Sequence, residues 1–281
     1  MRAFMAFFVS TMMTFSQRYG PWGVVLGASE GLGAAYADGL GRRGLSVVAA
    51  ARRPEPLGNV TDAVAERHGV STRRVQLDLA APGFMDTLRA VTDDLDVGLV
   101  VYNGASAYIG RFLEQDEDSM RAIVTVNCLG PLLVCEHFGP RLVERGHGGL
   151  VIMGSAAGLA GSAFNSAYSA SKAFDIVLGE ALWAEWRDFG VDVLSVIGPA
   201  IDTPNFRSMS RETREDLPAP MAPEVVVDEV LDEALGTTPS FVPGDEVRSM
   251  LAMLGGLPRK QQVEALSAAQ AALGKEPHAG R

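Results

Sequence analysis

A tyrosine and a lysine, Tyr168 and Lys172, stand four residues apart, and Ser155 lies thirteen residues before the tyrosine. Four residues are about one turn of an α-helix, so we expect the phenol and the ammonium to share one helix face. A phenol, whose pKa is ordinarily ~10, ionises more easily beside a fixed cation. With a serine hydroxyl holding a carbonyl oxygen, this set could exchange a proton with that oxygen during hydride transfer. Taken alone, such a pair is far more often an ordinary surface pair on a helix, so the rest of the chain must decide.

A glycine-rich segment near the N-terminus, Gly27-Ala28-Ser29-Glu30-Gly31-Leu32-Gly33, is the second candidate site. It follows the apolar residues 22–25 and precedes a helical stretch at residues 34–43. Glycines let a backbone approach a pyrophosphate closely, and a helix N-terminus offers free N–H groups. The spacing is Gly-x-x-x-Gly-x-Gly rather than the commoner Gly-x-Gly-x-x-Gly. We interpret the segment as a nucleotide-binding turn, with a flexible strand–helix connection as the alternative.

Short apolar runs that alternate with longer helical stretches predict the elements that position these residues. The pattern indicates an α/β fold, a single Rossmann-type doubly wound parallel sheet of about seven strands with helices on both faces. The expected strands are residues 23–26, 46–51, 74–77, 99–102, 150–153, 191–196 and 240–242, and the expected long helices are residues 116–145 and 168–189. Ser29, Asn103, Ser155 and Pro199 all follow strands, so we expect them to converge at the carboxyl edge of the sheet.

The order and spacing of these motifs resemble the short-chain dehydrogenase/reductase family over about residues 22–204. Besides the glycine turn and the Tyr-x-x-x-Lys pair, Asn103-Gly104-Ala105 stands where the family has Asn-Asn-Ala-Gly, and Asn127 matches the helix asparagine. The resemblance implies an NAD(P)-dependent oxidoreductase that interconverts a ketone and a secondary alcohol. It implies that Tyr168 exchanges the proton, that Lys172 acidifies Tyr168 and holds the nicotinamide ribose, that Ser155 orients the substrate oxygen, and that Asn127 positions a water linking Lys172 to solvent.

Positions that contact the cofactor also carry over from the resemblance. They correspond to Gly27, Ser29, Glu30, Gly31, Leu32, Gly33, Arg52, Arg53, Asp78, Leu79, Asn103, Gly104, Ala105, Tyr168, Lys172, Pro199, Ile201 and Thr203.

Two arginines, Arg52 and Arg53, end the second strand, where a site for NAD usually has a carboxylate. Arginine binds phosphate with two donors, so we expect NADP(H) over NAD(H), with Arg52 as the preferred contact and two solvated arginines as the alternative. Glu30 argues the other way, because NADP-preferring relatives often carry a basic residue there. Asp78 either contacts adenine or caps the turn that follows it.

The chain departs from the family pattern in three places. Leu26 replaces a threonine that ties the glycine turn to a neighbouring loop, and Gly104-Ala105 reverses the usual order. Gly198-Pro199 likewise reverses the usual Pro-Gly, which moves a fixed φ and removes a different N–H. The role of Thr203 at the nicotinamide carboxamide is therefore the least secure part of the resemblance.

Three segments are expected to line the substrate pocket: residues 106–112, 159–164 and 201–209. Most of their side chains are apolar, which favours a small apolar ketone or secondary alcohol. The chain is similar to the branch that holds 17β-hydroxysteroid dehydrogenases and long-chain 3-oxoacyl-CoA reductases. Two other classes stay open, a regulatory protein that binds the nucleotide without turnover and a non-redox epimerase or dehydratase.

Composition narrows the partners further. The 281 residues carry a formal net charge of −10, which argues against a nucleic-acid partner. Two cysteines, Cys128 and Cys135, and four scattered histidines form no metal-ligand pattern, so we expect no metal. The resemblance implies a homodimer or homotetramer built on the two long helices. Trp183 and Trp186 could serve that contact or the core.

Residues 1–20 form an expected N-terminal extension, and residues 21–281 one domain with a substrate-side lid near 203–217. The apolar run at residues 1–15 is short for a membrane span and lacks a clear signal-peptide cleavage pattern. Attachment to a membrane through residues 1–17 as an amphipathic helix stays open. Packing on the body, or an extension upstream of the true start, fits better, and we expect a cytoplasmic protein.

Overall fold

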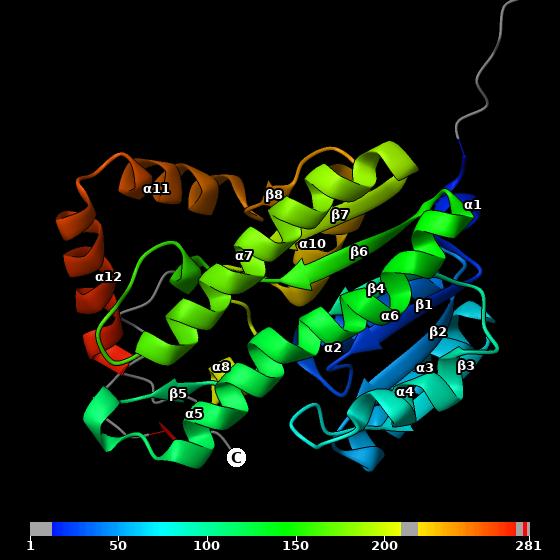
Figure 1. Ribbon diagram of the computed structural model, residues 1–281, viewed down its shortest axis with the longest axis horizontal. Coiled ribbons are helices and arrows are strands. Elements are labelled where there is room, and N and C mark those ends of the chain that lie inside the picture. The colour runs from blue at the N-terminus through cyan, green and yellow to red at the C-terminus, as the bar shows by residue number, and fades with distance from the viewer. Residues whose placement is uncertain (1–12, 209–218, 274–277, 280–281) are drawn as a thin grey trace, which may run out of the picture.

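Seven parallel strands form the centre of the protein, in the order β3-β2-β1-β4-β6-β7-β8 (Figure 1). The computed structural model describes residues 13–208, 219–273 and 278–279. The strands are β1 (Trp22–Leu26), β2 (Ser46–Ala51), β3 (Thr72–Gln76), β4 (Val97–Tyr102), β6 (Gly148–Met153), β7 (Val191–Val196) and β8 (Ser240–Phe241). Every neighbouring pair runs parallel. The predicted fold class is confirmed.

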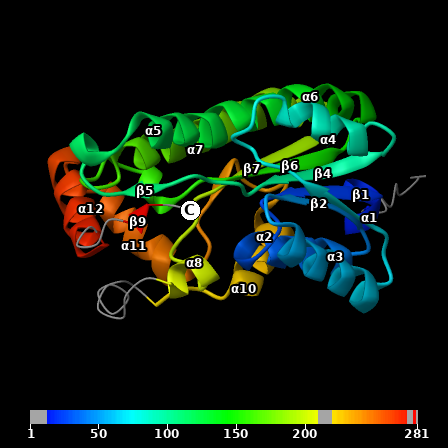
Figure 2. The same ribbon diagram turned by 90° about the horizontal axis from the view of Figure 1, so that it is seen from below.

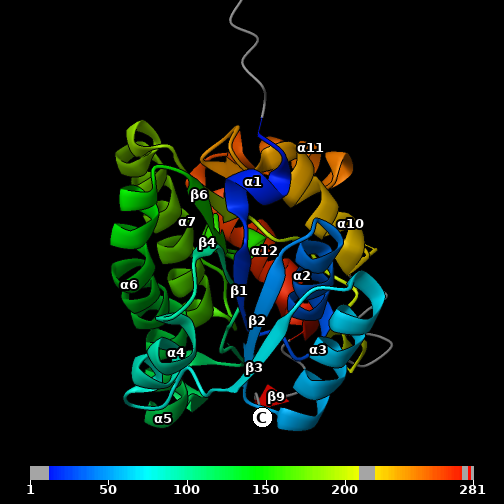
Figure 3. The same ribbon diagram turned by 90° about the vertical axis from the view of Figure 1, so that its right-hand side faces the viewer.

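Helices cover both faces of this sheet (Figures 2 and 3). One face carries α4 (Phe84–Thr92), α5 (Glu117–Val124), α6 (Gly130–Arg145) and α7 (Ser166–Trp186). The other carries α2 (Gly31–Arg42), α3 (Pro54–His68) and α10 (Pro223–Asp228), which continues into the π-helical η5 (Glu229–Ala234). Because both faces are covered, the strands are continuous apolar runs with few exposed positions.

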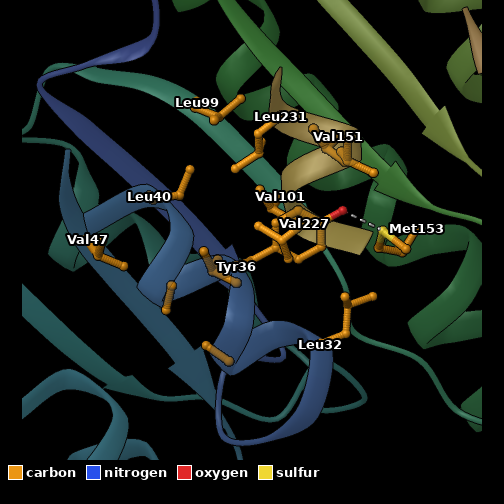
Figure 4. Packing of buried hydrophobic residues seen from close by; sticks show 14 of the residues in the cluster. Leu32, Tyr36, Leu40, Val47, Leu99, Val101, Val151, Met153, Val227 and Leu231 are labelled. Atoms are coloured by element: carbon orange, nitrogen blue, oxygen red, sulfur yellow. Dashed lines mark hydrogen bonds between the residues drawn. The ribbon is translucent and has the colours of Figure 1, made fainter. Parts of the chain in front are cut away.

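Tyr36 of α2 shows how a helix is fixed to the sheet (Figure 4). Its ring is fully buried, and its hydroxyl donates to the Met153 sulfur at 3.3 Å. Leu40 from the same helix and Val227 from α10 belong to the same buried cluster. Burial of a side chain of this size is worth several kcal/mol, about 25 cal/mol per Å² of apolar surface. The cluster therefore holds the N-terminus of α2 at the end of β1.

The predicted long helix at residues 116–145 is one continuous helical stretch with a π-helical turn, η2 (Thr125–Leu129), between α5 and α6. Glu117–Arg145 is long and apolar enough to cross a bilayer by length and composition, but 50% of its most apolar window is buried inside the protein. That burial is typical of a helix that packs on a core. A π turn inserts one extra residue and often accompanies a functional site.

The C-terminal segment returns to the carboxyl edge of the sheet through α11 (Asp245–Gly255) and α12 (Arg259–Leu273) (Figure 1). Beyond them, β9 (His278–Ala279) pairs antiparallel with β5 (Tyr108–Ile109). Short helical turns complete the chain: η1 (Phe112–Glu114), η3 (Ala156–Gly158), η4 (Arg187–Phe189) and α8 (Pro204–Arg207). The small β5–β9 sheet was not predicted.

A short N-terminal helix, α1 (Phe15–Tyr19), lies at the opposite edge of the sheet (Figure 3). Asp192 of β7 accepts hydrogen bonds from the Arg18 guanidinium at 2.6 Å and the Tyr19 hydroxyl at 2.7 Å. Burial, and then the hydrogen bond to Asp192, raise the pKa of Tyr19 above its usual value. The helix α1 therefore packs on the body through Arg18 and Tyr19. Residues 1–12, on which the expectation of membrane attachment mostly rests, lie outside the described part of the chain.

Candidate active site

The glycine turn after β1 has the form of a phosphate cradle. Gly27 and Gly31 adopt φ values of +84° and +55°, which side chains rarely tolerate. A Cβ at Gly33 would collide with the carbonyl of Gly27, so α2 can begin against the turn only with glycine there. Glu30 caps α2 without a side-chain hydrogen bond, which leaves the first N–H groups of the helix open to an anion. These features fit the pyrophosphate of a dinucleotide.

Asn103 closes the turn from the side of β4. Its amide nitrogen donates to the carbonyl of Gly27 at 3.2 Å, and its backbone N–H donates to Leu26 at 3.1 Å. Gly104 follows, where a Cβ would collide with the side chain of Leu79. The tie that a threonine at position 26 would supply is thus made from the neighbouring loop. Asn103, Gly104 and Leu79 meet at the turn, and Ala105 is exposed beside them.

The two predicted arginines lie differently. Arg53 pairs with Glu30 at 2.7 Å and donates to the Ser29 hydroxyl at 3.4 Å, directly beside the glycine turn. The backbone carbonyl of Arg52 accepts a hydrogen bond from Gln76 at 3.4 Å. Arg53 thus lies against the glycine turn, and the preference for Arg52 as the phosphate contact stays a prediction.

Asp78 is exposed, and its carboxylate accepts the N–H of Ala80 at 3.0 Å. It therefore caps the turn after β3, which was the second of its two expected roles. A carboxylate has several acceptor positions, so the cap leaves room for a further partner.

Ser155 lies two residues after β6 and caps the start of η3. Its hydroxyl accepts the N–H of Ala157 at 3.2 Å, and the next N–H, of Ala156, donates to Gly198 at 3.0 Å. Gly158 then lies so close to α7 that a Cβ there would stand 2.6 Å from the backbone nitrogen of Ala173. The serine turn is thereby fixed against the helix that carries the tyrosine and the lysine.

Tyr168 and Lys172 lie one turn apart near the start of α7, as predicted. The Lys172 nitrogen is 5.8 Å from the centre of the Tyr168 ring. It donates to the carbonyl of Met153 at 2.7 Å and to Asp175 at 2.9 Å. Lys172 is 3% exposed and Tyr168 is half-buried. An ammonium has three donors, so two are engaged by these groups and a third can reach another acceptor.

Asn127 lies in the π turn with its side chain fully buried. Its amide exchanges two hydrogen bonds of 2.8 Å with the backbone of Ser106 and donates a third, of 2.9 Å, to the Ser171 hydroxyl. That hydroxyl donates to the carbonyl of Tyr168 at 2.7 Å. Asn127 therefore ties the loop after β4 to the first turns of α7, and the water that it is expected to position stays a prediction.

The loop after β7 reaches the glycine turn. Gly198 bonds to the serine turn, Pro199 follows, and Ile201 pairs with Met221. The Thr203 hydroxyl caps α8 by accepting the Phe206 N–H at 3.2 Å, while its methyl lies 2.9 Å from where a Cβ of Gly31 would stand. The reversed Gly-Pro order thus still brings Thr203 beside the cradle. Of the expected lid, residues 209–217 fall outside the described residues.

A family model for short chain dehydrogenases matches residues 22–214, which is most of the chain. The chain belongs to the short-chain dehydrogenase/reductase family. It is an oxidoreductase that interconverts alcohols and ketones with a nicotinamide cofactor. The resemblance derived from the motifs is confirmed.

Two similar relatives show which branch of the short-chain dehydrogenases this chain joins. A 7beta-hydroxysteroid dehydrogenase from Collinsella aerofaciens is 30% identical over 83% of this chain and 89% of its own length. A very-long-chain 3-oxoacyl-CoA reductase from Aspergillus clavatus is 35% identical over 72% of this chain and 59% of its own length. Hydroxysteroid dehydrogenases and 3-oxoacyl-CoA reductases were the expected relatives.

Two solved structures have the same fold. One, described in work on 7beta-hydroxysteroid dehydrogenase stereoselectivity, superposes with a TM-score of 0.83 at 27% identity, covering 90% of this chain and 99% of its own. The other, a short-chain dehydrogenase from Sphingobium yanoikuyae in complex with NADPH, has a TM-score of 0.75 at 25% identity, covering 93% and 98%.

The segments that were expected to line the substrate pocket are held by contacts that the sequence did not reveal. Arg259 of α12 donates to the carbonyl of Leu159 at 2.7 Å, and the Ser267 hydroxyl accepts the Ala163 N–H at 3.0 Å. Phe164 adopts φ +65°, and its carbonyl accepts the Gly110 N–H at 2.8 Å. Each contact joins segments far apart in sequence, so no local pattern could have indicated it.

Asp175 is a further residue that the sequence analysis did not single out. It is 1% exposed, and one carboxylate oxygen binds Lys172 while the other, Oδ1, has no hydrogen-bond partner among the described residues. Burial raises the pKa of Asp175 to about 6, against the opposing charge of Lys172. An acidic residue three positions after a lysine shares its helix face, and that spacing was a usable signal.

Cys128 and Cys135 lie close enough to Asp175 to interact with it electrostatically. Burial raises the pKa of Cys128, and it raises that of Cys135 to about 12, so both stay thiols at neutral pH. Within residues 13–208, 219–273 and 278–279, no three His, Cys, Asp or Glu side chains gather as metal ligands would.

Proposed function

We propose that the protein reduces the ketone of an apolar substrate with NADPH, or oxidises the corresponding secondary alcohol, with Tyr168 as the proton donor or acceptor. The observation that carries the proposal is the cluster at the carboxyl edge of β6. There, Tyr168 and the buried ammonium of Lys172 share one face of α7, and the turn of Ser155 packs against that helix.

Each residue has a distinct task in this proposal. Tyr168 holds the proton that the substrate oxygen receives on reduction. Lys172 is held by Met153 and Asp175, and its positive charge stabilises the phenolate that forms when Tyr168 gives up its proton. The third N–H of the ammonium donates to a ribose hydroxyl of the cofactor. Ser155 donates its hydroxyl hydrogen to the substrate oxygen, because its own oxygen already accepts the Ala157 N–H. When bound, the nicotinamide cofactor supplies or takes up the hydride.

NADP(H) is the proposed cofactor. The cradle of Gly27, Gly31 and Gly33 suits the pyrophosphate, and Arg53 stands beside Ser29, where a 2′-phosphate would replace Glu30 as its partner. The glutamate weakens this preference, since a carboxylate repels phosphate. A solved relative that holds NADPH supports the proposal.

An apolar substrate of steroid-like or acyl type is proposed from the segments around the cluster. Ile109, Leu159 and Phe206 come from the three segments, one from each, and Leu251 and Leu254 of the tail helix α11 belong to the same apolar cluster as Leu159. The relatives named above, a hydroxysteroid dehydrogenase and a 3-oxoacyl-CoA reductase, support this class.

A spectrophotometric assay tests the proposal and separates the three functional classes. Loss of NADPH absorbance is followed with a panel of steroid ketones, 3-oxoacyl thioesters, small ketones and polar sugars, with NADH in parallel. We expect net oxidation with the steroid ketones or thioesters, faster with NADPH. Turnover of the sugars alone would contradict the apolar substrate class. Tight binding of NADPH without oxidation would indicate a regulatory protein, and product without net oxidation an epimerase or dehydratase.

We also propose a homo-oligomer formed through the face of α5, α6 and α7. This face exposes apolar side chains at Val124, Leu129, Leu132 and Val177. Trp183 and Trp186 are only partly buried and pack against the core beneath the same helices, Trp186 beside Gly139.

A further inference from the structure

A buried ion pair holds Lys172, and the proton exchange proposed for Tyr168 does not by itself account for it. Asp175 lies one turn after Lys172, with 1% of its surface exposed against 3% for the lysine. The Lys172 nitrogen is 2.9 Å from one Asp175 oxygen and 2.7 Å from the carbonyl of Met153. Removing two charges from water is costly, so a buried pair is weak evidence for added stability. Its position beside Tyr168 suggests a role in the reaction instead.

The groups that face the Asp175 carboxylate come from four elements. Lys172 lies on its own helix, Tyr102 on β4, Cys128 on the π turn and Cys135 on α6, and each interacts electrostatically with the carboxylate. Burial raises the pKa values of both cysteines and of Tyr102, so these three are neutral below pH 8. Lys172 is thus the single cation among these neighbours. Within the part of the chain that the structure describes, Oδ1 has no hydrogen-bond partner to share the negative charge.

This arrangement reduces the effect of Lys172 on Tyr168. The Lys172 cation stabilises a nearby phenolate. The Asp175 anion, which lies in the same low-dielectric surroundings, opposes that stabilisation. The Asp175 carboxylate and the Met153 carbonyl together hold the ammonium, whose nitrogen lies 5.8 Å from the centre of the Tyr168 ring. Burial raises the pKa of Asp175 to about 6. Its negative charge is therefore lost as the pH falls through that value, within the range where an enzyme works.

We infer that Asp175 is a positioning residue for proton exchange: its charge anchors the Lys172 ammonium and sets the pH range in which Tyr168 gains and loses its proton. The inference rests on the proposed role of Tyr168. Asp175 touches neither substrate nor cofactor in this scheme and acts only through Lys172.

Asp175→Asn tests the charge separately from the contact, because an amide oxygen can still accept the ammonium N–H. The readout is the titration of the Tyr168 phenolate by ultraviolet difference absorbance, with the Tyr168→Phe chain subtracted in each background. Without the opposing charge, the phenolate forms more easily, so its midpoint is expected to fall by about one pH unit. The acid limb of alcohol oxidation, measured as kcat/KM, is expected to move down by the same amount.

Ser195→Ala is the matched control. The Ser195 hydroxyl donates to the backbone carbonyl of Asp175 at 3.0 Å and is fully buried. Its loss perturbs the same site without changing a charge, so it is expected to lower stability and leave both midpoints unchanged. An unchanged or higher phenolate midpoint in Asp175→Asn, or an equal shift in Ser195→Ala, overturns the inference.

The wild-type chain offers a second test if Asp175→Asn does not fold. Protonation of the Asp175 carboxyl is followed by infrared spectroscopy. The Tyr168 ring is followed by nuclear magnetic resonance, and the Tyr168→Phe variant identifies which resonance belongs to it. We expect the Tyr168 resonance to shift over the same pH range, near 6, in which the Asp175 carboxyl titrates. Independent titrations overturn the inference. Neither spectroscopic readout needs turnover, so failure of the proposed ketone reduction is seen separately.

Discussion

Tyr168, Lys172, Ser155 and Asn127 are each held by neighbours that come from another part of the chain. Lys172 depends on Met153 of β6 and on Asp175, and Asn127 depends on Ser106 and Ser171. A proton donor must be held within hydrogen-bond reach of the substrate oxygen, so these supporting contacts decide whether the four residues can act together.

Asn127 gives the first prediction. Asn127→Ala removes three hydrogen bonds and takes the side-chain partner from two partly buried backbone groups of Ser106. The free energy of unfolding is expected to fall by roughly 2–4 kcal/mol, measured by urea denaturation. Ser171→Ala keeps both bonds to Ser106 and removes the third bond together with the donation of the Ser171 hydroxyl to the Tyr168 carbonyl, and it is expected to cost less than half as much. Equal losses in the two variants would show that the tie to the loop after β4 contributes little.

Arg53 gives the second prediction. Arg53→Ala is expected to weaken binding of NADPH by about tenfold or more, because a charge-assisted hydrogen bond to phosphate is worth ~1.5–3 kcal/mol. Binding of NADH, which lacks the 2′-phosphate, is expected to change little. Fluorescence titration with both cofactors measures the difference, and Arg52→Ala compares the two arginines. Equal weakening of NADPH and NADH in Arg53→Ala would contradict the proposed contact.

At the scale of residues, the sequence predicted which side chains form the candidate site, but it did not predict which side chains pair with them. The Tyr-x-x-x-Lys spacing fixed a shared helix face, because 3.6 residues make a turn whatever the tertiary structure. The partners of Arg53 and Lys172 depend on which side-chain rotamer each takes in the folded protein. A helix-face argument that had included Asp175 would have found the ion pair, but not the unpartnered oxygen.

At the scale of elements, the close approach of η3 to α7 fixes the turn of Ser155 against the helix that carries Tyr168 and Lys172. Backbone atoms of Lys172 and Ala173 lie 2.6 Å from where a Cβ of Gly158 would stand, and backbone cannot yield as a flexible side chain can. Only glycine at position 158 permits this packing.

Gly158→Ala therefore gives the third prediction. It is expected to push η3 from α7 and lower kcat by at least about tenfold, since small misplacements of catalytic groups are costly. Gly161→Ala is the control, because nothing lies within 4 Å of its Cβ position in the same loop. Steady-state kinetics with a ketone identified by the panel measure both. Similar kcat values for the two variants would mean that η3 does not need this contact.

Strand positions were predicted within about two residues because strands buried on both faces are continuous apolar runs. The expected start of β3 at residue 74 was two residues late. Thr72 and Arg73 continue the backbone ladder with β2 although their side chains are polar, as an edge strand allows. The two-residue pairing of β5 with β9 joins positions some 170 residues apart. A pairing that short leaves no periodic pattern in a sequence.

At the scale of the whole molecule, the proposed homo-oligomer depends on a balance between surface charge and exposed apolar side chains. The chain carries a net charge of −10, which opposes close approach of two copies unless an apolar face outweighs the repulsion. The face of α5, α6 and α7 exposes such side chains, and Val177 at 63% is its most exposed one.

The fourth prediction concerns that face. Light scattering of the wild-type chain is expected to give the mass of a dimer or tetramer, and Val177→Glu to shift it toward the monomer, because a buried unpaired charge is costly at an interface. Val225→Glu, on α10 at the other face and 48% exposed, is expected to leave the mass unchanged. A monomeric wild type, or equal effects of the two changes, would contradict assembly through this face.

The most direct measurement of the central claim compares Tyr168→Phe with wild type in cofactor binding and in turnover. We predict NADPH affinity close to wild type and a loss of about 10²–10⁴ in kcat for ketone reduction, the range that a positioned proton donor provides. Tyr36→Phe, which removes a hydroxyl bonded to Met153 in the core, is expected to keep its turnover. Unchanged turnover in Tyr168→Phe would contradict the account, since no phenol would then be needed to protonate the substrate oxygen.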